Sequence, residues 1–190
     1  ANTSTLTDED GLGQLAYEWL RDETLVATTP TYLLTQDDVG ASISVTVSYT
    51  DGGNTPESLT STSTATVANV NDPPVGSVTI DGVAVEDQTL SANTSALTDE
   101  DGLGQLAYEW LRDETLVATT PTYDLTQADV GASISVTVSY TDGGNTPESL
   151  TSTSTGTVAN LNDPPVGSVT IDGVAVEDQT LSANTSALTD

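Results

Sequence analysis

Carboxylates recur in matching loops along this sequence. The stretch Asp8-Glu9-Asp10-Gly11 returns as Asp99-Glu100-Asp101-Gly102, and Asp51 returns as Asp142 in a second pair of Asp-Gly-Gly loops. Carboxylates held close together repel one another, and a hard divalent cation that takes six to eight oxygen ligands relieves that repulsion. Calcium suits flexible carboxylate and carbonyl ligands better than magnesium does. The chemistry that this pattern predicts is calcium binding.

Further oxygen ligands lie in two Asn-Asp-Pro-Pro linkers and in a repeated Glu-Asp pair. Gly11 is the fourth residue of its loop, whereas an EF-hand needs glycine at the sixth position, so these loops are not EF-hands. An Asp in such a loop can also serve only its turn, and Asp129, three residues after Thr126, can instead cap a single helical turn. The predicted metal ligands are Asp8, Asp10, Asp51, Asn71, Asp72, Glu86, Asp87, Asp99, Asp101, Asp142, Asn162, Asp163, Glu177, Asp178 and Asp190.

Composition excludes several other chemistries. The 190 residues include 29 Asp and Glu against two basic residues, Arg21 and Arg112, which gives a formal net charge of −27. Without Cys or His there is no disulfide, no zinc finger and no Ser-His or Cys-His nucleophile pair. A chain this acidic cannot neutralise phosphates, so nucleic acid is excluded as a partner, and no apolar run is long enough for insertion into a membrane. We expect each Arg to pair with a nearby carboxylate.

The elements that position the carboxylates come from an internal repeat. Residues 1–99 aligned on 92–190 differ at five positions, so the chain holds two copies of a 91-residue unit and the first eight residues of a third. A period of 91 is too long for a solenoid and suits a row of small domains. Near-identical copies in series lengthen a protein but give no obvious advantage to catalysis, so the repeat favours an architectural role.

Within one copy every signal is β. Short alternating runs such as 75–80, 106–111 and 132–140 are separated by Asp-Gly and Gly-Gly turns, and a returning strand is predicted over 149–160. Seven short strands in about 90 residues predict an immunoglobulin-like β-sandwich, with Trp19 and Trp110 in the core. The predicted fold class is all-β, with tandem immunoglobulin-like β-sandwich domains in an end-to-end array.

The motifs LTDEDGLG, YEWLRD, LTQ(A/D)DVGASISV, SYTDGG and VNDPP together resemble the tandem extender repeats of bacterial RTX adhesins, which belong to a wider group of Ig-like and cadherin-like repeats. The resemblance implies secretion, many calcium ions, and a stalk that projects a distal ligand-binding module from the bacterial cell surface in adhesion and biofilm formation. Cadherin-type linkers resemble this chain at Asn71-Asp72, Glu86-Asp87 and Asp99-x-Asp101. The expected partners are adjacent repeats of the same chain.

The repeat begins near Pro74, out of frame with the printed sequence. We therefore expect residues 1–72 to be a repeat that lacks its first strands, 73–163 to be a complete repeat, and 164–190 to carry the first strands of a further one. Two readings stay open for the incomplete ends. Strands at 166–182 complete the 1–72 fragment of a neighbouring copy, head to tail, or the sequence is a window on a longer tandem array.

Two other functions compete with the structural role. A glycan- or protein-binding adhesion module would show exposed aromatic side chains or diversified loops, whereas the copies barely differ. An enzyme that uses paired carboxylates, as glycosidases do, is supported only by the abundance of Asp and Glu. The sequence therefore predicts that the protein is not an enzyme.

Overall fold

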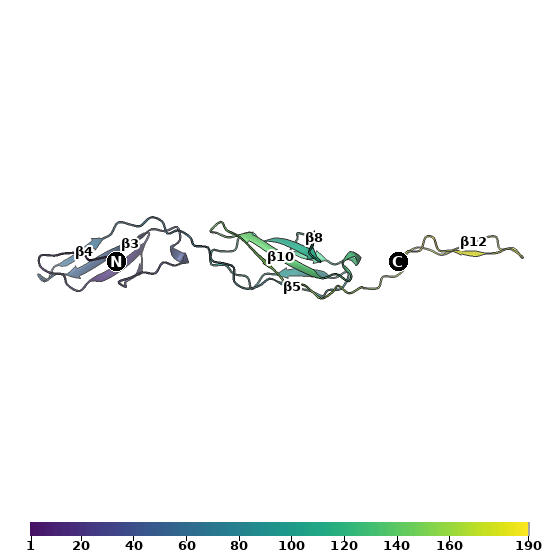
Figure 1. Ribbon diagram of the computed structural model, residues 1–190, viewed down its shortest axis with the longest axis horizontal. Coiled ribbons are helices and arrows are strands. Elements are labelled where there is room, and N and C mark those ends of the chain that lie inside the picture. The colour runs from purple at the N-terminus through teal and green to yellow at the C-terminus, as the bar shows by residue number, and fades with distance from the viewer. Residues whose placement is uncertain (190) are drawn as a thin grey trace. The chain divides into compact units, whose positions relative to one another are not determined.

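The protein is all-β, and the immunoglobulin-like β-sandwich predicted from the sequence is confirmed. The computed structural model describes residues 1–189 (Figure 1). Spatial contacts divide the chain into two compact units. Unit 1 is Ala1–Gly76 with Thr98–Gln105 and Tyr140–Glu148, and unit 2 is Ser77–Leu97 with Leu106–Ser139 and Ser149–Asp190. The domain boundaries at residues 72 and 163 and the end-to-end array stay predictions.

Unit 1 contains an antiparallel sheet with the strand order β2-β1-β3-β4. The strands are β1 (Ala16–Arg21), β2 (Thr24–Ala27), β3 (Ile43–Thr50) and β4 (Pro56–Thr60). The turn between β1 and β2 is tight, because Asp22 and Glu23 both adopt positive φ, 42° and 69°, which matches the twist of a hairpin. Strand β3 alternates apolar and polar side chains, so one face of the sheet is apolar.

Unit 2 holds the sandwich core. One sheet has the order β11-β10-β7-β8 and the other has the order β5-β6-β9. Trp110, Leu90 and Val138 are fully buried in the cluster between them. The strands are β5 (Thr79–Asp81), β6 (Thr89–Asn93), β7 (Ala107–Arg112), β8 (Thr115–Ala118), β9 (Thr122–Asp124), β10 (Ile134–Thr141) and β11 (Pro147–Thr151).

The returning strand predicted over 149–160 is shorter than expected and ends at Thr151. Beyond it, side-chain oxygens replace backbone carbonyls as acceptors: Val136 N–H donates to Ser152 Oγ, and Ile134 N–H donates to Thr155 Oγ1, both at 3.0 Å. Between these two bonds β10 advances by two residues and the returning segment by three, so one extra residue interrupts the ladder, which disfavours edge-to-edge pairing with another sheet.

Unit 2 also carries a two-stranded hairpin of β12 (Thr170–Asp172) and β13 (Ser182–Asn184), shown in yellow in Figure 1. Its apolar side chains are open to solvent: Val169 and Ile171 are 59% and 72% exposed. Among the described residues, no helix is long and apolar enough to cross a membrane.

Candidate metal site

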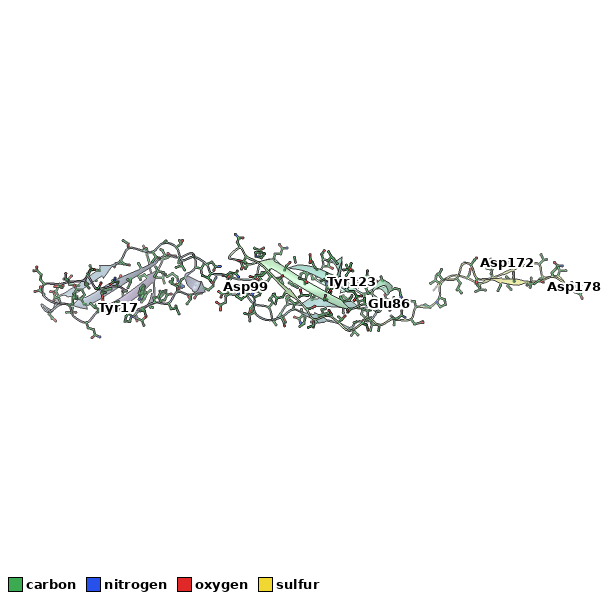
Figure 2. The ribbon with its side chains drawn as sticks, in the orientation of Figure 1. Tyr17, Glu86, Asp99, Tyr123, Asp172 and Asp178 are labelled. Atoms are coloured by element: carbon green, nitrogen blue, oxygen red, sulfur yellow. The ribbon has the colours of Figure 1, made fainter. Side chains whose placement is uncertain are left out.

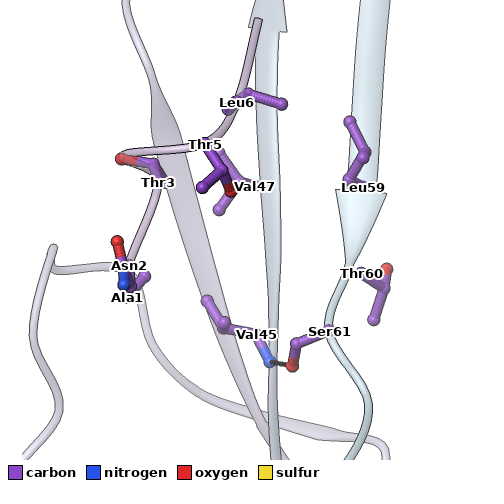
Figure 3. Close-up of a pocket in the computed structure, with 10 residues that line it drawn as sticks. All are labelled: Ala1, Asn2, Thr3, Thr5, Leu6, Val45, Val47, Leu59, Thr60 and Ser61. Atoms are coloured by element: carbon purple, nitrogen blue, oxygen red, sulfur yellow. Dashed lines mark hydrogen bonds between the residues drawn. The ribbon is translucent and has the colours of Figure 1, made fainter.

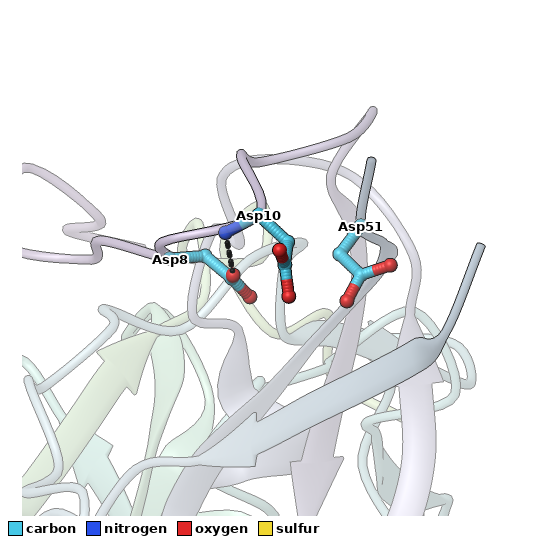
Figure 4. A group of neighbouring side chains, drawn as sticks. All are labelled: Asp8, Asp10 and Asp51. Atoms are coloured by element: carbon cyan, nitrogen blue, oxygen red, sulfur yellow. Dashed lines mark hydrogen bonds between the residues drawn. The ribbon is translucent and has the colours of Figure 1, made fainter. Parts of the chain in front are cut away.

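Three aspartates of unit 1 converge from two loops. The backbone N–H of Asp10 donates to Asp8 Oδ1 at 2.9 Å, which folds the first loop back on itself (Figure 4). The N–H of Gly52 donates to the carbonyl of Asp10 at 3.1 Å and ties this loop to the one that carries Asp51. As a result, carboxylate oxygens of Asp8, Asp10 and Asp51 lie within 4.8 Å of one another.

The same arrangement recurs 91 residues later, also within unit 1. Carboxylate oxygens of Asp99, Asp101 and Asp142 again lie within 4.8 Å of one another. Asp101 and Asp142 are buried, at 8% and 6% exposure, whereas Asp10 is exposed in the first cluster. The second cluster is therefore the more enclosed of the two.

The linker and a glutamine enclose the second cluster. The N–H of Asp72 donates to Asp101 Oδ2 at 2.8 Å, and the side-chain amide of Gln36 donates to Asp101 Oδ1 at 2.9 Å. Nearby, the amide of Asn71 donates to Glu148 at 3.1 Å. These contacts connect the Asn-Asp-Pro-Pro linker to the acidic loop that follows it in the sequence.

A tyrosine at the end of a strand holds one aspartate in each cluster. The Tyr140 hydroxyl donates to Asp99 Oδ2 at 2.6 Å, and Tyr49 donates to Asp8 Oδ2 at 2.9 Å. Burial, and then the bond to Asp99, raise the pKa of Tyr140 far above its ordinary value. The bond to Asp8 is the main cause of the raised pKa of Tyr49. Both hydroxyls are protonated at neutral pH, as in any tyrosine, and these hydrogen bonds orient the two carboxylates.

One oxygen of the second cluster is buried without a partner. Asp142 Oδ1 accepts a hydrogen bond from the N–H of Thr146 at 2.7 Å, but within residues 1–189 nothing donates to its Oδ2. A buried carboxylate oxygen without a donor is unfavourable, and a cation beside it satisfies it. The donor set, made of carboxylate oxygens on flexible loops, fits calcium. Asp99, Asp101 and Asp142 are the residues that would hold it.

Glu86, another predicted ligand, is buried elsewhere, in unit 2. Glu86, labelled in Figure 2, is 2% exposed, and its carboxylate accepts the N–H of Leu161 at 3.1 Å. With its amide nitrogen turned toward the carboxylate, Gln127 donates to both oxygens of Glu86, at 2.9 and 3.3 Å. Among the described residues, Glu86 is a member of neither aspartate cluster.

The remaining predicted ligands that the structure describes are on the surface. Asp87 is an exposed turn residue with φ of 63°. Asp190 lies outside the described residues. The other exposed ligands, none of them in either aspartate cluster of the described chain, are Asn162, Asp163, Glu177 and Asp178.

Asp129 caps the short helical turn that follows Thr126, which is the alternative to metal binding given in the sequence analysis. Its carboxylate accepts from the N–H of Thr126 at 2.8 Å, from the Tyr123 hydroxyl at 2.8 Å and from Arg112 at 3.2 Å. Burial raises the pKa of Asp129, but these hydrogen bonds outweigh it and the pKa is lowered. The expected pairing of each Arg with a nearby carboxylate is confirmed, because Arg21 contacts Asp38 in the same way at 3.3 Å.

The sequence reasoning missed Gln36, Tyr49 and Tyr140. Gln36 belongs to the repeated LTQ motif, which contributed only to the family resemblance. Tyr49 and Tyr140 each lie two residues after a buried valine, Val47 or Val138, near the end of an alternating strand, so they point to the same face of the sheet. This alternation could have predicted that both tyrosines point inward.

Comparisons with known proteins add the following. No family model matches the chain, and no curated protein matches it. Among solved structures, the chain is similar to fibronectin(III)-like modules of Clostridium thermocellum CbhA, with 15% sequence identity, a TM-score of 0.28, and coverage of 82% of this chain and 82% of that chain. The strand order and the loops of the chain itself show a tandem repeat of Ig-like type whose loops carry two clusters of aspartates.

Proposed function

We propose that this chain is a structural extender of a large secreted bacterial cell-surface adhesin, in which calcium at the linkers stiffens a stalk that projects distal ligand-binding domains. The observation that carries the proposal is the buried Oδ2 of Asp142, which has no hydrogen-bond partner within residues 1–189, in a cluster whose Asp101 also accepts the N–H of linker residue Asp72. The location outside the cell and the role in adhesion and biofilm formation follow from the motif resemblance.

The physical logic joins metal binding to stiffness. Three carboxylates within 4.8 Å repel one another until a divalent cation compensates their charge. Because Asp101 also holds Asp72, a cation that fixes Asp101 also fixes the linker. Pro73 and Pro74 restrict the backbone directly after Asp72, so few linker conformations remain.

The burial of the aromatic side chains supports a structural role over glycan binding. Trp110 is fully buried, and its indole N–H donates to the carbonyl of Thr120 at 2.8 Å. Its ring stacks on Tyr123 at 5.9 Å between centroids. A ring used in this way is not available as a platform for a sugar.

A matched pair of variants tests calcium binding. We expect titration calorimetry of the metal-free chain with calcium to give a Kd of about 10⁻⁴ to 10⁻³ M, the range of extracellular modules. Asp101→Asn should remove the tighter site, whereas Asp10→Asn, the same change in the more open cluster, should leave that site intact. No heat of binding, or equal binding by wild type and Asp101→Asn, would refute the proposal.

A further inference from the structure

Two short segments of unit 2 pair in parallel although they come from opposite ends of the repeat. Val85 forms a parallel bridge with Ala159. The N–H of Glu86 donates to the carbonyl of Ala159, and the N–H of Ala159 donates to the carbonyl of Ala84, both at 2.9 Å. Segment 84–86 follows the first Asn-Asp-Pro-Pro linker after one short strand, β5, and segment 159–161 directly precedes the second linker.

The parallel direction decides how tension along the chain acts on this pair. A pull through the first linker reaches segment 84–86 from its N-terminal side, and a pull through the second reaches segment 159–161 from its C-terminal side. Because the segments run parallel, the two pulls oppose each other along one axis and shear the hydrogen bonds between them. Sheared bonds share the load, whereas an antiparallel pair pulled from the same two sides would open one bond at a time.

A buried carboxylate reinforces the pair where the two segments approach the second linker. Glu86 is 2% exposed and accepts the N–H of Leu161 at 3.1 Å. The amide of Gln127, turned toward it, donates to its two oxygens at 2.9 and 3.3 Å. Hydrogen bonds to an ionised group are stronger than neutral ones, and a buried charge that loses its donors is strongly unfavourable. Sliding of the segments separates Leu161 from Glu86 and so meets this resistance.

The segment that leads to the second linker is also held on its other side. Val158 is 2% exposed in the core cluster and exchanges backbone hydrogen bonds of 2.9 Å with the loop 130–132. A backbone N–H of β10 donates to Ser152 Oγ at 3.0 Å, and unit 1 has the same bond from Val45 to Ser61, drawn in Figure 3. Segment 159–161 therefore cannot simply follow segment 84–86, and the load falls on the bonds between the two.

We infer that segments 84–86 and 159–161 form the force-bearing clamp of the repeat, and that Glu86, held by Gln127, is its latch. The inference rests on the proposed function for the source of the tension, because a stalk transmits force from one linker to the next. The clamp itself needs no cation, since every donor to Glu86 named above belongs to the protein.

Single-molecule force spectroscopy of the full chain in EDTA tests the latch. The chain has no Cys, so a cysteine added at each end attaches the handles at unique positions. Forced unfolding reports the unfolding rate, and Glu86→Ala should raise that rate for unit 2 by about tenfold or more at equal load, because it removes hydrogen bonds to a charged group. Glu86→Gln keeps an acceptor for Leu161 and should lie between the two. Unit 1, which carries neither substitution, gives a reference event on the same molecule.

Two controls separate the clamp from general stability. Val138→Ala removes part of a fully buried side chain on β10 without touching either segment, so it should lower stability in urea but accelerate forced unfolding less than Glu86→Ala does. Gly156→Cys moves the second handle to a position before segment 159–161, and no neighbouring atom lies within 4 Å of a side chain there. Tension then no longer shears the clamp, so unit 2 should rupture at lower force and Glu86→Ala should have little further effect.

The outcomes separate this inference from the proposed function. Equal forced-unfolding rates for wild type and Glu86→Ala, or equal rupture forces for the two handle positions, would overturn the clamp. An effect of Glu86→Ala that appears only in calcium would assign Glu86 to a metal and overturn the latch. A latch that works in EDTA together with no heat of calcium binding would support the clamp and refute the calcium role alone. Should Glu86→Ala fail to fold, Glu86→Gln and the handle at position 156 still decide.

Discussion

Replacing Asp142 with Asn should change stability in opposite directions with and without calcium. The substitution keeps an oxygen to accept the N–H of Thr146 but removes one charge from a cluster whose carboxylate oxygens lie within 4.8 Å. Two carboxylate pairs involve Asp142. At that distance each pair repels by about 1 kcal/mol at the dielectric constant of water and by about 3.5 kcal/mol at an effective value of 20.

Because the cluster lies in loops and salt screens its charges, we use the lower repulsion energy, about 1 kcal/mol per carboxylate pair. Asp142→Asn should then stabilise unit 1 by about 2 kcal/mol in EDTA, which corresponds to a rise in melting temperature of about 10 °C for a small domain. In calcium the order reverses, since wild type gains about 2.7 kcal/mol at a hundredfold excess over Kd and the variant gains little.

Urea unfolding followed by tryptophan fluorescence, in EDTA and in calcium, gives both free energies. Glu109→Gln, an exposed change on β7 with the same loss of charge, should show no reversal. If Asp142→Asn were destabilising in EDTA as well as in calcium, the repulsion argument would be wrong.

Three further predictions follow from the same contacts. Tyr140→Phe removes the 2.6 Å bond that orients its aspartate, so calcium affinity measured by calorimetry should fall by roughly tenfold; Tyr49→Phe should leave this site unchanged. Trp110→Ala should cost about 3–5 kcal/mol in urea unfolding, because the ring is fully buried, and Trp19→Ala, whose ring is half-buried, should cost less. Burial and a carboxylate hydrogen bond raise the pKa of Tyr123 from 10.0 to about 12. Its contribution to stability should therefore be complete below pH 10 and be lost as the pH rises to 12. Tyr123→Phe should flatten this decline, and equal alkaline slopes for wild type and variant would contradict the assignment.

Local patterns carried much of the fold and of the site. Alternation in 132–140 predicted β10, and the repeated acidic loops pointed to Asp99, Asp101 and Asp142, whose carboxylate oxygens lie within 4.8 Å of one another. Local patterns did not place Gln36 on Asp101, because that contact joins residues 65 apart. They also overextended the strand after 149, because Ser152 and Thr155 have the β-compatible pattern but use their hydroxyls in place of backbone carbonyls.

The most direct test of the central claim is small-angle X-ray scattering of the chain at a series of low concentrations, with and without calcium. A stiffened extender should show a longer maximum dimension and a narrower distribution of sizes in calcium, with successive repeats advancing by about 35–45 Å, the length of a sandwich of ten-residue strands with its loops. Scattering curves that superimpose in EDTA and in millimolar calcium would contradict calcium stiffening.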